Sequence, residues 1–266
     1  WDGLPESLRA AITANQLQLH LQPIQRMADG RIVSYEALSR WTHPVLGAVP
    51  PALFIGVAER SGQIVDLTRW TLNVGLRHLA ELRRVDPEVR LAVNLSVEVL
   101  QLPGFVDQVF DLMRLWCVPP NGLMLEVTES ALMRDVGQCE RLLAALRAGG
   151  VRVAIDDFGT GYSSMAYLHR LPVDTLKIDR YFVLTMNKDE GSAKIVKSVV
   201  NLGRDLALEV VAEGVENAEL ARLLLDAQCH YGQGFGYAPA LPAQEAEVYL
   251  AESLADGTAP LKQRSA

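Results

Sequence analysis

Features that mark a secreted or membrane-spanning chain are scarce in this sequence. It has three cysteines, Cys117, Cys139 and Cys229, and none lies in a paired or CxxC spacing. An odd, sparse cysteine count argues against a disulfide framework and against a structural zinc site. No apolar run approaches the ~20 residues that span a bilayer, and the polar start, WDGLPESLRA, lacks the core of a signal peptide. We therefore expect a cytoplasmic domain.

Blocks of basic residues are also missing. The chain has 25 Lys and Arg against 32 Asp and Glu, which gives a formal net charge of −7. A nucleic-acid polymer is therefore not an expected partner, because such binding depends on clustered positive charge. An anionic small molecule stays open as a ligand, provided that cations lie between it and the acidic residues of its site.

Linkers and low-complexity segments are missing from about residues 1–255 of the 266. This length is large for one domain but normal for an α/β barrel, and 49% of the residues are hydrophobic, enough for a sizeable core. We expect a single domain over residues 1–255 and a tail over residues 256–266. Because no initiator Met is present, we also expect a segment of a longer chain.

Short apolar runs alternate with helix-like segments along the chain. Residues 137–148 read as a helix that stops at Gly149 and Gly150. Eight such runs, alternating with helices, predict an α/β fold of the (β/α)8, or TIM, barrel type. Only about MADGR separates the first two runs, so we expect an antiparallel hairpin and hence a modified barrel with an antiparallel first strand. The predicted strands are residues 17–23, 32–41, 90–95, 123–128, 151–156, 175–179, 209–213 and about 229–235.

Polar residues close one face of these strands. Successive side chains on a strand point to opposite faces, so in RLAVN Leu91 and Val93 share one face while Asn94 ends the other. The same alternation recurs in LMLEVTE, VRVAID, LKID and VVAE, and it leaves the aliphatic set to pack under the outer helices. The C-terminal ends of barrel strands carry the active site. The side chains expected to converge there are Asn94, Glu126, Asp156, Lys177 and Glu213, and in IVSYEALSR the face shared by Glu36, Leu38 and Arg40.

Asp156 and Asp157 are adjacent and open the loop motif DDFGTGYSS. Two like charges side by side hinder each other's ionisation, and several carboxylates around one cavity would repel unless divalent cations lay between them. Oxygen ligands favour the hard ions Mg²⁺ and Mn²⁺. The aspartate pair suits a site in which one carboxylate bridges two ions about 3.5–4 Å apart, a common arrangement for phosphodiester hydrolysis.

The sequence resembles the EAL-domain family of cyclic di-GMP phosphodiesterases over about residues 8–250. Glu36, Ala37 and Leu38 are the EAL for which that family is named. Each motif alone is weak, but together and in order they are highly specific. The motifs are QPI (22–24), EALSRW (36–41), VNLS (93–96), EVTES (126–130), DDFGTGYSS (156–164), LKID (176–179), AEGVE (212–216) and QGF (233–235).

The resemblance implies hydrolysis of cyclic di-GMP to linear 5′-pGpG with two Mg²⁺ or Mn²⁺ ions. It implies that Lys177 holds and polarises the attacking water, that Glu213 is a ligand or base near the second ion, and that Glu129 anchors the loop after Asp157. Gln233 would position the water or the second-ion site. The implied ligands are Glu36, Asn94, Glu126 and Asp156 for one ion and Asp156, Asp157 and Glu213 for the other. The implied substrate contacts are Gln22, Leu38, Arg40 and Gln233, with Arg40 on a phosphate.

Other interpretations stay open beside this one. A receptor domain could bind cyclic di-GMP without cutting it, although this chain keeps the Glu of EAL and the metal ligands that receptor-type relatives usually lose. Lys177 could merely neutralise the acids, and Arg40 could be a structural partner of one of them. Glu126 and Glu213 could each be solvated strand-end carboxylates, which is the usual fate of acids.

The resemblance also has implications for assembly. It implies a homodimer whose interface is linked to the second ion through the loop after Asp157. Members of the family often act within longer signalling proteins, so we expect sensor or GGDEF domains in the full-length protein, which could itself be anchored to a membrane.

Overall fold

The computed structural model describes residues 3–133, 136–160, 168–255 and 257. Within them, eight strands close into a barrel, which confirms the predicted modified (β/α)8 fold. Strand β1 pairs antiparallel with both β2 and β9, and the other neighbours in the barrel are parallel. The barrel strands are β1 (Gln18–Arg26), β2 (Ile32–His43), β4 (Arg90–Leu95), β5 (Leu123–Thr128), β6 (Arg152–Phe158), β7 (Thr175–Ile178), β8 (Glu209–Glu213) and β9 (Tyr231–Gln233).

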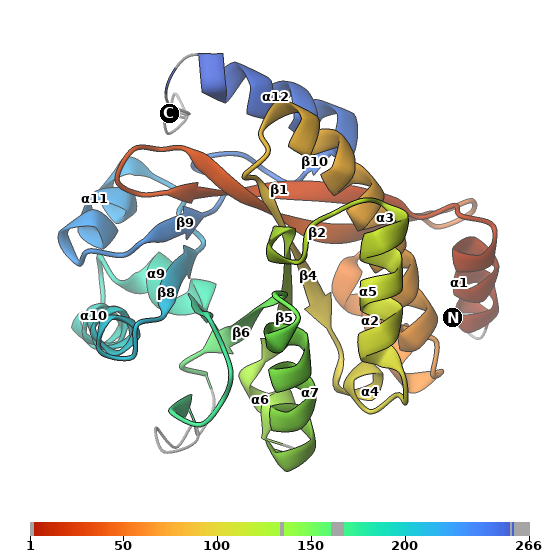
Figure 1. Cartoon of the computed structure of the whole chain (residues 1–266). Coiled ribbons are helices and arrows are strands. Elements are labelled where there is room, and N and C mark those ends of the chain that lie inside the picture. The colour runs from red at the N-terminus through yellow and green to blue at the C-terminus, as the bar shows by residue number, and fades with distance from the viewer. Residues whose placement is uncertain (1–2, 134–135, 161–167, 256, 258–266) are drawn as a thin grey trace.

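Helices surround this barrel, and the β1–β2 hairpin runs along one side of it beneath the last helix, α12 (Figure 1). Two short strands, β3 (Gly47–Val49) and β10 (Leu241–Pro242), extend the sheet beyond the barrel, and no sequence pattern predicted them. The described helices are α1 (Leu4–Thr13), α2 (Pro51–Arg60), α3 (Ile64–Val85), α4 (Val97–Leu100), α5 (Phe105–Leu115), α6 (Glu129–Leu132), α7 (Val136–Ala148), α9 (Arg180–Thr185), α10 (Glu190–Asp205), α11 (Ala218–Asp226) and α12 (Ala243–Ala255), with a 3₁₀ turn at Pro120–Gly122.

Local sequence sets several of these helix ends. Helix α7 stops where Gly150 adopts a left-handed φ of 94°, and a Cβ on Gly149 would lie 2.1 Å from the ring of Phe110. Asp189 and Asn217 cap the starts of α10 and α11 by accepting backbone N–H bonds. In the part of the chain that the structure describes, no helix is long and apolar enough to cross a membrane.

The alternation of side chains along the strands divides the core in two. Leu91, Val93 and Leu125 are fully buried in the large cluster between the barrel and its helices. The opposite faces of the same strands contribute Ala92, Met124 and Ala154, which form a separate apolar layer inside the barrel. Polar side chains lie on the interior face on either side of this layer, so the barrel is polar inside at both ends.

Candidate functional site

Lys177 on β7 is the electrostatic centre of the site. Its side chain is 1% exposed, and its Nζ lies 2.6 Å from Glu213, 2.7 Å from Glu126, 3.3 Å from Asp156 and 3.6 Å from Glu36. Burial alone would lower the pKa of Lys177, but the four surrounding carboxylates hold that pKa well above its usual value. The ammonium therefore stays charged, and it compensates only part of the negative charge around it.

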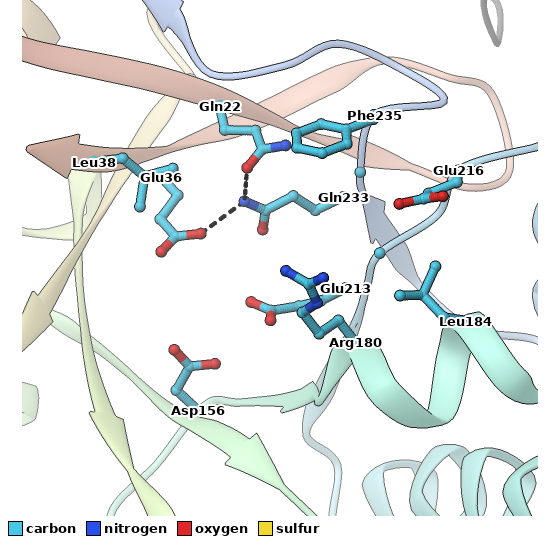
Figure 2. Close-up of a pocket in the computed structure, with 12 residues that line it drawn as sticks. Gln22, Glu36, Leu38, Asp156, Arg180, Leu184, Glu213, Glu216, Gln233 and Phe235 are labelled. Atoms are coloured by element: carbon cyan, nitrogen blue, oxygen red, sulfur yellow. Dashed lines mark hydrogen bonds between the residues drawn. The ribbon is translucent and has the colours of Figure 1, made fainter. Parts of the chain in front are cut away.

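Two amide side chains, those of Asn94 and Gln233, donate hydrogen bonds to Glu36. Asn94 Nδ2 donates to Glu36 Oε1 at 2.8 Å, and Gln233 Nε2 donates to Glu36 Oε2 at 2.7 Å. Gln233 Nε2 also donates to Gln22 Oε1 at 3.2 Å, so the three residues form a chain (Figure 2). Burial raises the pKa of Glu36, but the charge of Lys177 and the two amides outweigh burial and lower that pKa below its usual value. Glu36 is therefore ionised.

The backbone at Asp157 explains how two adjacent aspartates reach one site. The register between β6 and β7 shifts between Ile155 and Phe158, and Asp157 adopts a left-handed φ of 55°. Its backbone N–H donates to Asp156 Oδ1 at 2.9 Å. A bulge of this kind re-aims a side chain that strict alternation would send to the outside. As a result Asp156, Asp157 and Glu213 each offer an oxygen within 4.8 Å of the others.

These acids fit a divalent cation. The oxygen Glu126 Oε1 is buried and has no hydrogen-bond partner among the described residues. Burial raises the pKa of Glu126 well above its usual value, and burial followed by the charge of Asp156 raises the pKa of Asp157 to about 6 and that of Glu213 to about 8. Without a counterion Glu126 and Glu213 hold protons at neutral pH, and Asp157 gains one as the pH falls to about 6. An oxygen-only cluster prefers a hard ion.

We expect the affinity of the metal-free protein for Mn²⁺ to rise between pH 6 and pH 8. Glu213, with a pKa of about 8, and Asp157, with a pKa of about 6, hold protons in this range that a bound ion must displace. The association constant should rise by up to about tenfold per pH unit for each proton displaced. Calorimetric titration across this pH range measures the slope. A Glu213→Gln variant should show a shallower slope, and a flat profile in the unmodified protein would contradict the assignment.

Two cavities meet at this centre, one on each side of Leu38. One measures ≈ 210 Å³ and includes Gln22, Glu36, Glu213 and Gln233 in its walls. The other measures ≈ 350 Å³ and runs from Asn94 and Asp157 past Arg40 to α2 and α3. Leu38 and Asp156 line both. Arg40 is half-buried, and its Nη1 donates to the carbonyl of Ser39. All the predicted ligand and substrate-contact residues except Glu126 therefore line one or both of these cavities, and the buried Glu126 contacts Lys177.

Glu129 lies beneath this mouth at the start of α6. It is 2% exposed, and its Oε2 accepts the backbone N–H of Gly159 at 3.1 Å. Gly159 has a left-handed φ of 102° and directly follows the end of β6. This bond ties the segment after Asp157 to α6. The remainder of the DDFGTGYSS motif from Gly161 onwards lies outside the described residues.

Besides two glycines, four residues in the wall of the smaller cavity received no role from the sequence. Arg180 and Leu184 come from α9, Glu216 follows β8, and Phe235 follows β9 (Figure 2). Phe235 is 51% exposed, so a flat apolar ring borders the acidic centre. Glu216 and Phe235 belong to the motifs AEGVE and QGF, but the sequence assigned roles there only to Glu213 and Gln233. Arg180 follows LKID directly and had none.

The fold and this mouth define a class: an α/β barrel whose acidic, lysine-centred mouth can hold divalent cations. The chain belongs to the EAL domain family, whose family model matches residues 5–240. It is 40% identical over 260 residues to the cyclic di-GMP phosphodiesterase NbdA of Pseudomonas aeruginosa, a match that covers 97% of this chain and 33% of that protein. It is 41% identical over 243 residues to the bifunctional diguanylate cyclase/cyclic di-GMP phosphodiesterase MucR of the same organism, covering 91% and 36%.

Solved structures agree with this assignment. The PaMucR phosphodiesterase in complex with c-di-GMP superimposes with a TM-score of 0.88 at 40% identity, over 91% of this chain and 99% of that one. The FimX EAL domain from Pseudomonas aeruginosa bound to c-di-GMP gives a TM-score of 0.81 at 26% identity, over 89% and 95%. The chain spans about a third of the length of NbdA and of MucR.

Proposed function

We propose that this domain hydrolyses one phosphodiester bond of cyclic di-GMP to give linear 5′-pGpG, with two Mg²⁺ or Mn²⁺ ions. The observation that carries the proposal is the mouth itself, where four carboxylates surround one buried lysine and a fifth, Asp157, is turned toward them by a bulge. The same fold, at 40% identity, forms a phosphodiesterase that has been solved with c-di-GMP.

Each residue has a place in this proposal. Glu36, Asn94, Glu126 and Asp156 would hold one ion, and Asp156, Asp157 and Glu213 the other. When bound, the ions supply Lewis-acid activation of water and neutralise charge on the phosphate.

The residues around the ions bind and orient the reactants. Lys177 holds the attacking water and places a positive charge beside the charge that develops on the phosphate. Glu213 lies 2.6 Å from Lys177 and would act near the second ion as a ligand or as the base that accepts a proton from that water. Gln233 helps to orient the water, and Gln22, Leu38 and Arg40 contact the substrate. Glu129 holds the segment after Asp157 in place.

The decisive measurement is turnover of cyclic di-GMP. We expect the purified chain to release linear pGpG with Mn²⁺ present and to release none with excess EDTA, as resolved by chromatography. The metal dependence follows because the ions would activate the water and neutralise charge on the phosphate. Tight binding without cleavage at saturating Mn²⁺ would contradict the enzyme and favour the receptor.

We further propose that the domain acts as a homodimer within a longer signalling protein. The support for a longer protein is that NbdA and MucR are each about three times as long as the matched region, and that MucR is named a bifunctional cyclase and phosphodiesterase. The homodimer is what the family resemblance implies. Residues 256–266 would then be a tail beyond the domain, and the domain itself would lie in the cytoplasm. Light scattering of the purified chain tests the dimer.

A further inference from the structure

Arginines gather at the end of the barrel opposite the acidic mouth. Strands β4, β6 and β8 carry the mouth residues Asn94, Asp156 and Glu213 at or near their C-terminal ends. The same strands begin at the opposite end of the barrel with Arg90, Arg152 and Glu209. A cavity of ≈ 500 Å³ opens there. Five arginines line it, from the end of β1, the start of β2, the end of α3 and the starts of β4 and β6: Arg26, Arg31, Arg83, Arg90 and Arg152.

Four acids, Asp29, Asp86, Glu88 and Glu209, lie in or beside this cavity, so one of the five arginine charges is left uncompensated. Arg152 lies 2.6 Å and Arg90 lies 3.6 Å from the same oxygen, Glu209 Oε2, so that one carboxylate serves two guanidinium groups. The hydroxyl of Tyr231 donates to the other oxygen of Glu209 at 3.0 Å. Because Tyr231 is neutral, this inner group keeps a net charge of about +1. Its side chains are half-buried, so solvent screens that charge less than at an open surface.

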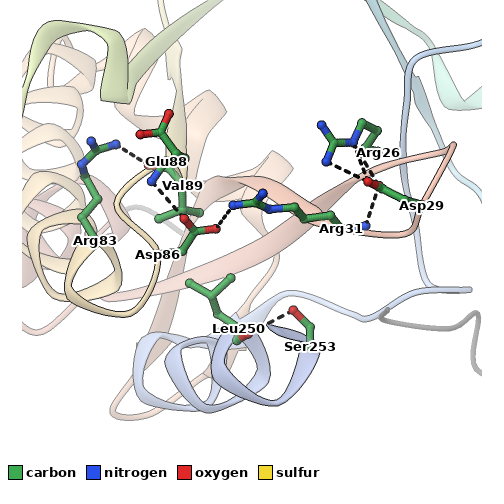
Figure 3. A network of polar contacts seen from close by, with 9 residues as sticks. All are labelled: Arg26, Asp29, Arg31, Arg83, Asp86, Glu88, Val89, Leu250 and Ser253. Carbon is green, nitrogen blue, oxygen red and sulfur yellow. Dashed lines mark hydrogen bonds and ion pairs between the residues drawn. The ribbon is translucent and has the colours of Figure 1, made fainter. Parts of the chain in front are cut away.

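The rim carries three arginines and, with Glu88 in the cavity wall, three acids, but only two of the arginines form ion pairs in the described residues. Arg26 pairs with Asp29 at 2.8 Å, and Arg31 pairs with Asp86 at 2.9 Å (Figure 3). In the described part of the chain Arg83 pairs with no carboxylate, and its Nη1 donates to the backbone carbonyl of Val89. The remaining donors of Arg83 are available to a ligand in the cavity.

One buried donor of Arg152, a residue of the cavity wall, also lacks a partner. The Nε–H of Arg152 is shielded from solvent and has no acceptor among the described residues. A buried donor without an acceptor costs on the order of 1–3 kcal/mol, so such a group favours a ligand that supplies an oxygen. Its position beside Arg90 offers a planar, multi-donor surface that matches the oxygens of a phosphate.

We propose that this arginine-lined cavity binds a small molecule that carries phosphate groups. The size of the cavity suits a nucleotide or a short inorganic phosphate, and the fork geometry of guanidinium groups favours phosphate over a halide. The buried layer of Ala92, Met124 and Ala154 separates the cavity from the acidic mouth. The cavity is therefore a second site, distinct from the one at which hydrolysis is proposed.

Inorganic pyrophosphate is the probe for the first test. The protein is freed of metal on a chelating resin, so that the acidic mouth repels the probe. Calorimetric titration should show saturable binding, and the melting temperature should rise above that in NaCl of matched ionic strength. Parallel titrations with GMP and inorganic phosphate distinguish the sources: tighter binding of GMP assigns a nucleotide, and equal binding assigns the phosphate alone.

Matched variants decide whether the cavity is the binding site. Arg152→Gln and Arg83→Gln should each weaken pyrophosphate binding by about fivefold or more, because each removes a charged donor. Arg83→Gln guards against misfolding, since Arg83 holds no carboxylate partner in the described structure. Arg222→Gln on α11, an exposed residue outside the cavity, is the control and should bind like the unmodified protein. Binding no stronger than in matched NaCl, or binding unchanged in both cavity variants, would overturn the proposal.

Discussion

An Asp156→Asn variant is expected to lose hydrolysis of cyclic di-GMP by on the order of 10³-fold, about 4 kcal/mol of transition-state stabilisation. Asp156 would hold both proposed ions. One of its oxygens lies 3.3 Å from Lys177 Nζ, and it offers an oxygen within 4.8 Å of oxygens of Asp157 and Glu213. An amide keeps the shape of the side chain but removes the charge that would bridge the ions. Initial rates of pGpG formation at saturating Mn²⁺ measure the loss.

The stability of the same variant separates lost chemistry from lost folding. Asn in place of Asp156 leaves three carboxyl groups around Lys177, so the metal-free variant should unfold in urea at a concentration close to that of the unmodified protein. Asp107→Asn on the exposed side of α5 is the control and should keep full activity. Wild-type rates in Asp156→Asn would rule out the proposed bridging role.

Alternation along strands was sufficient to predict much of the barrel interior. The segments containing Asn94, Glu126 and Lys177 are regular strands, so a period of two residues places these side chains on the face opposite the aliphatic set. The short MADGR connection likewise predicted the antiparallel pairing that sets Gln22 opposite Glu36. The positions of these side chains follow from local sequence, because the strands that carry them have a regular alternation of side chains.

Other parts of the site depend on interactions that no local pattern encodes. Asp157 reaches the mouth only because β6 bulges against β7, and this shift arises from strand pairing between distant segments. The wall formed by Arg180 and Phe235 comes from a short helix and a loop, in which neither a two-residue nor a 3.6-residue period applies. No local pattern predicted the arginine-lined cavity, because its arginines are single residues at the ends of separate strands and of one helix.

A Lys177→Met variant is expected to lower the free energy of unfolding of the metal-free protein by about 3–5 kcal/mol at pH 8. Methionine fills a similar volume, but it leaves the four carboxylates around a side chain that is 1% exposed without a cation. Urea unfolding with EDTA present measures the change. Lys194→Met, which removes an exposed partner of Glu190, should change stability by less than about 0.5 kcal/mol and serves as the control.

The deficit should shrink as the pH falls from 8 toward 5. The pKa of Glu213 is raised to about 8 even with Lys177 present, and losing the ammonium can only raise it further. Without the ammonium, which lowers the pKa of both Glu36 and Glu213, the folded variant binds more protons than the folded unmodified protein, so the difference in stability between the two narrows as the pH falls. A deficit that is independent of pH would show that Lys177 stabilises the barrel by packing and not by charge.

Mn²⁺ then separates the two roles left open for Lys177. If the lysine only neutralises the acids, bound ions should restore both the stability and the hydrolytic rate of Lys177→Met. If it also holds the attacking water, Mn²⁺ should restore stability while the rate stays on the order of 10²-fold or more below that of the unmodified protein. We expect the second result, because Lys177 Nζ lies within 3.3 Å of Asp156 and Glu213, where the proposed water must be held. Measuring unfolding and turnover on one preparation, at one Mn²⁺ concentration, distinguishes these outcomes.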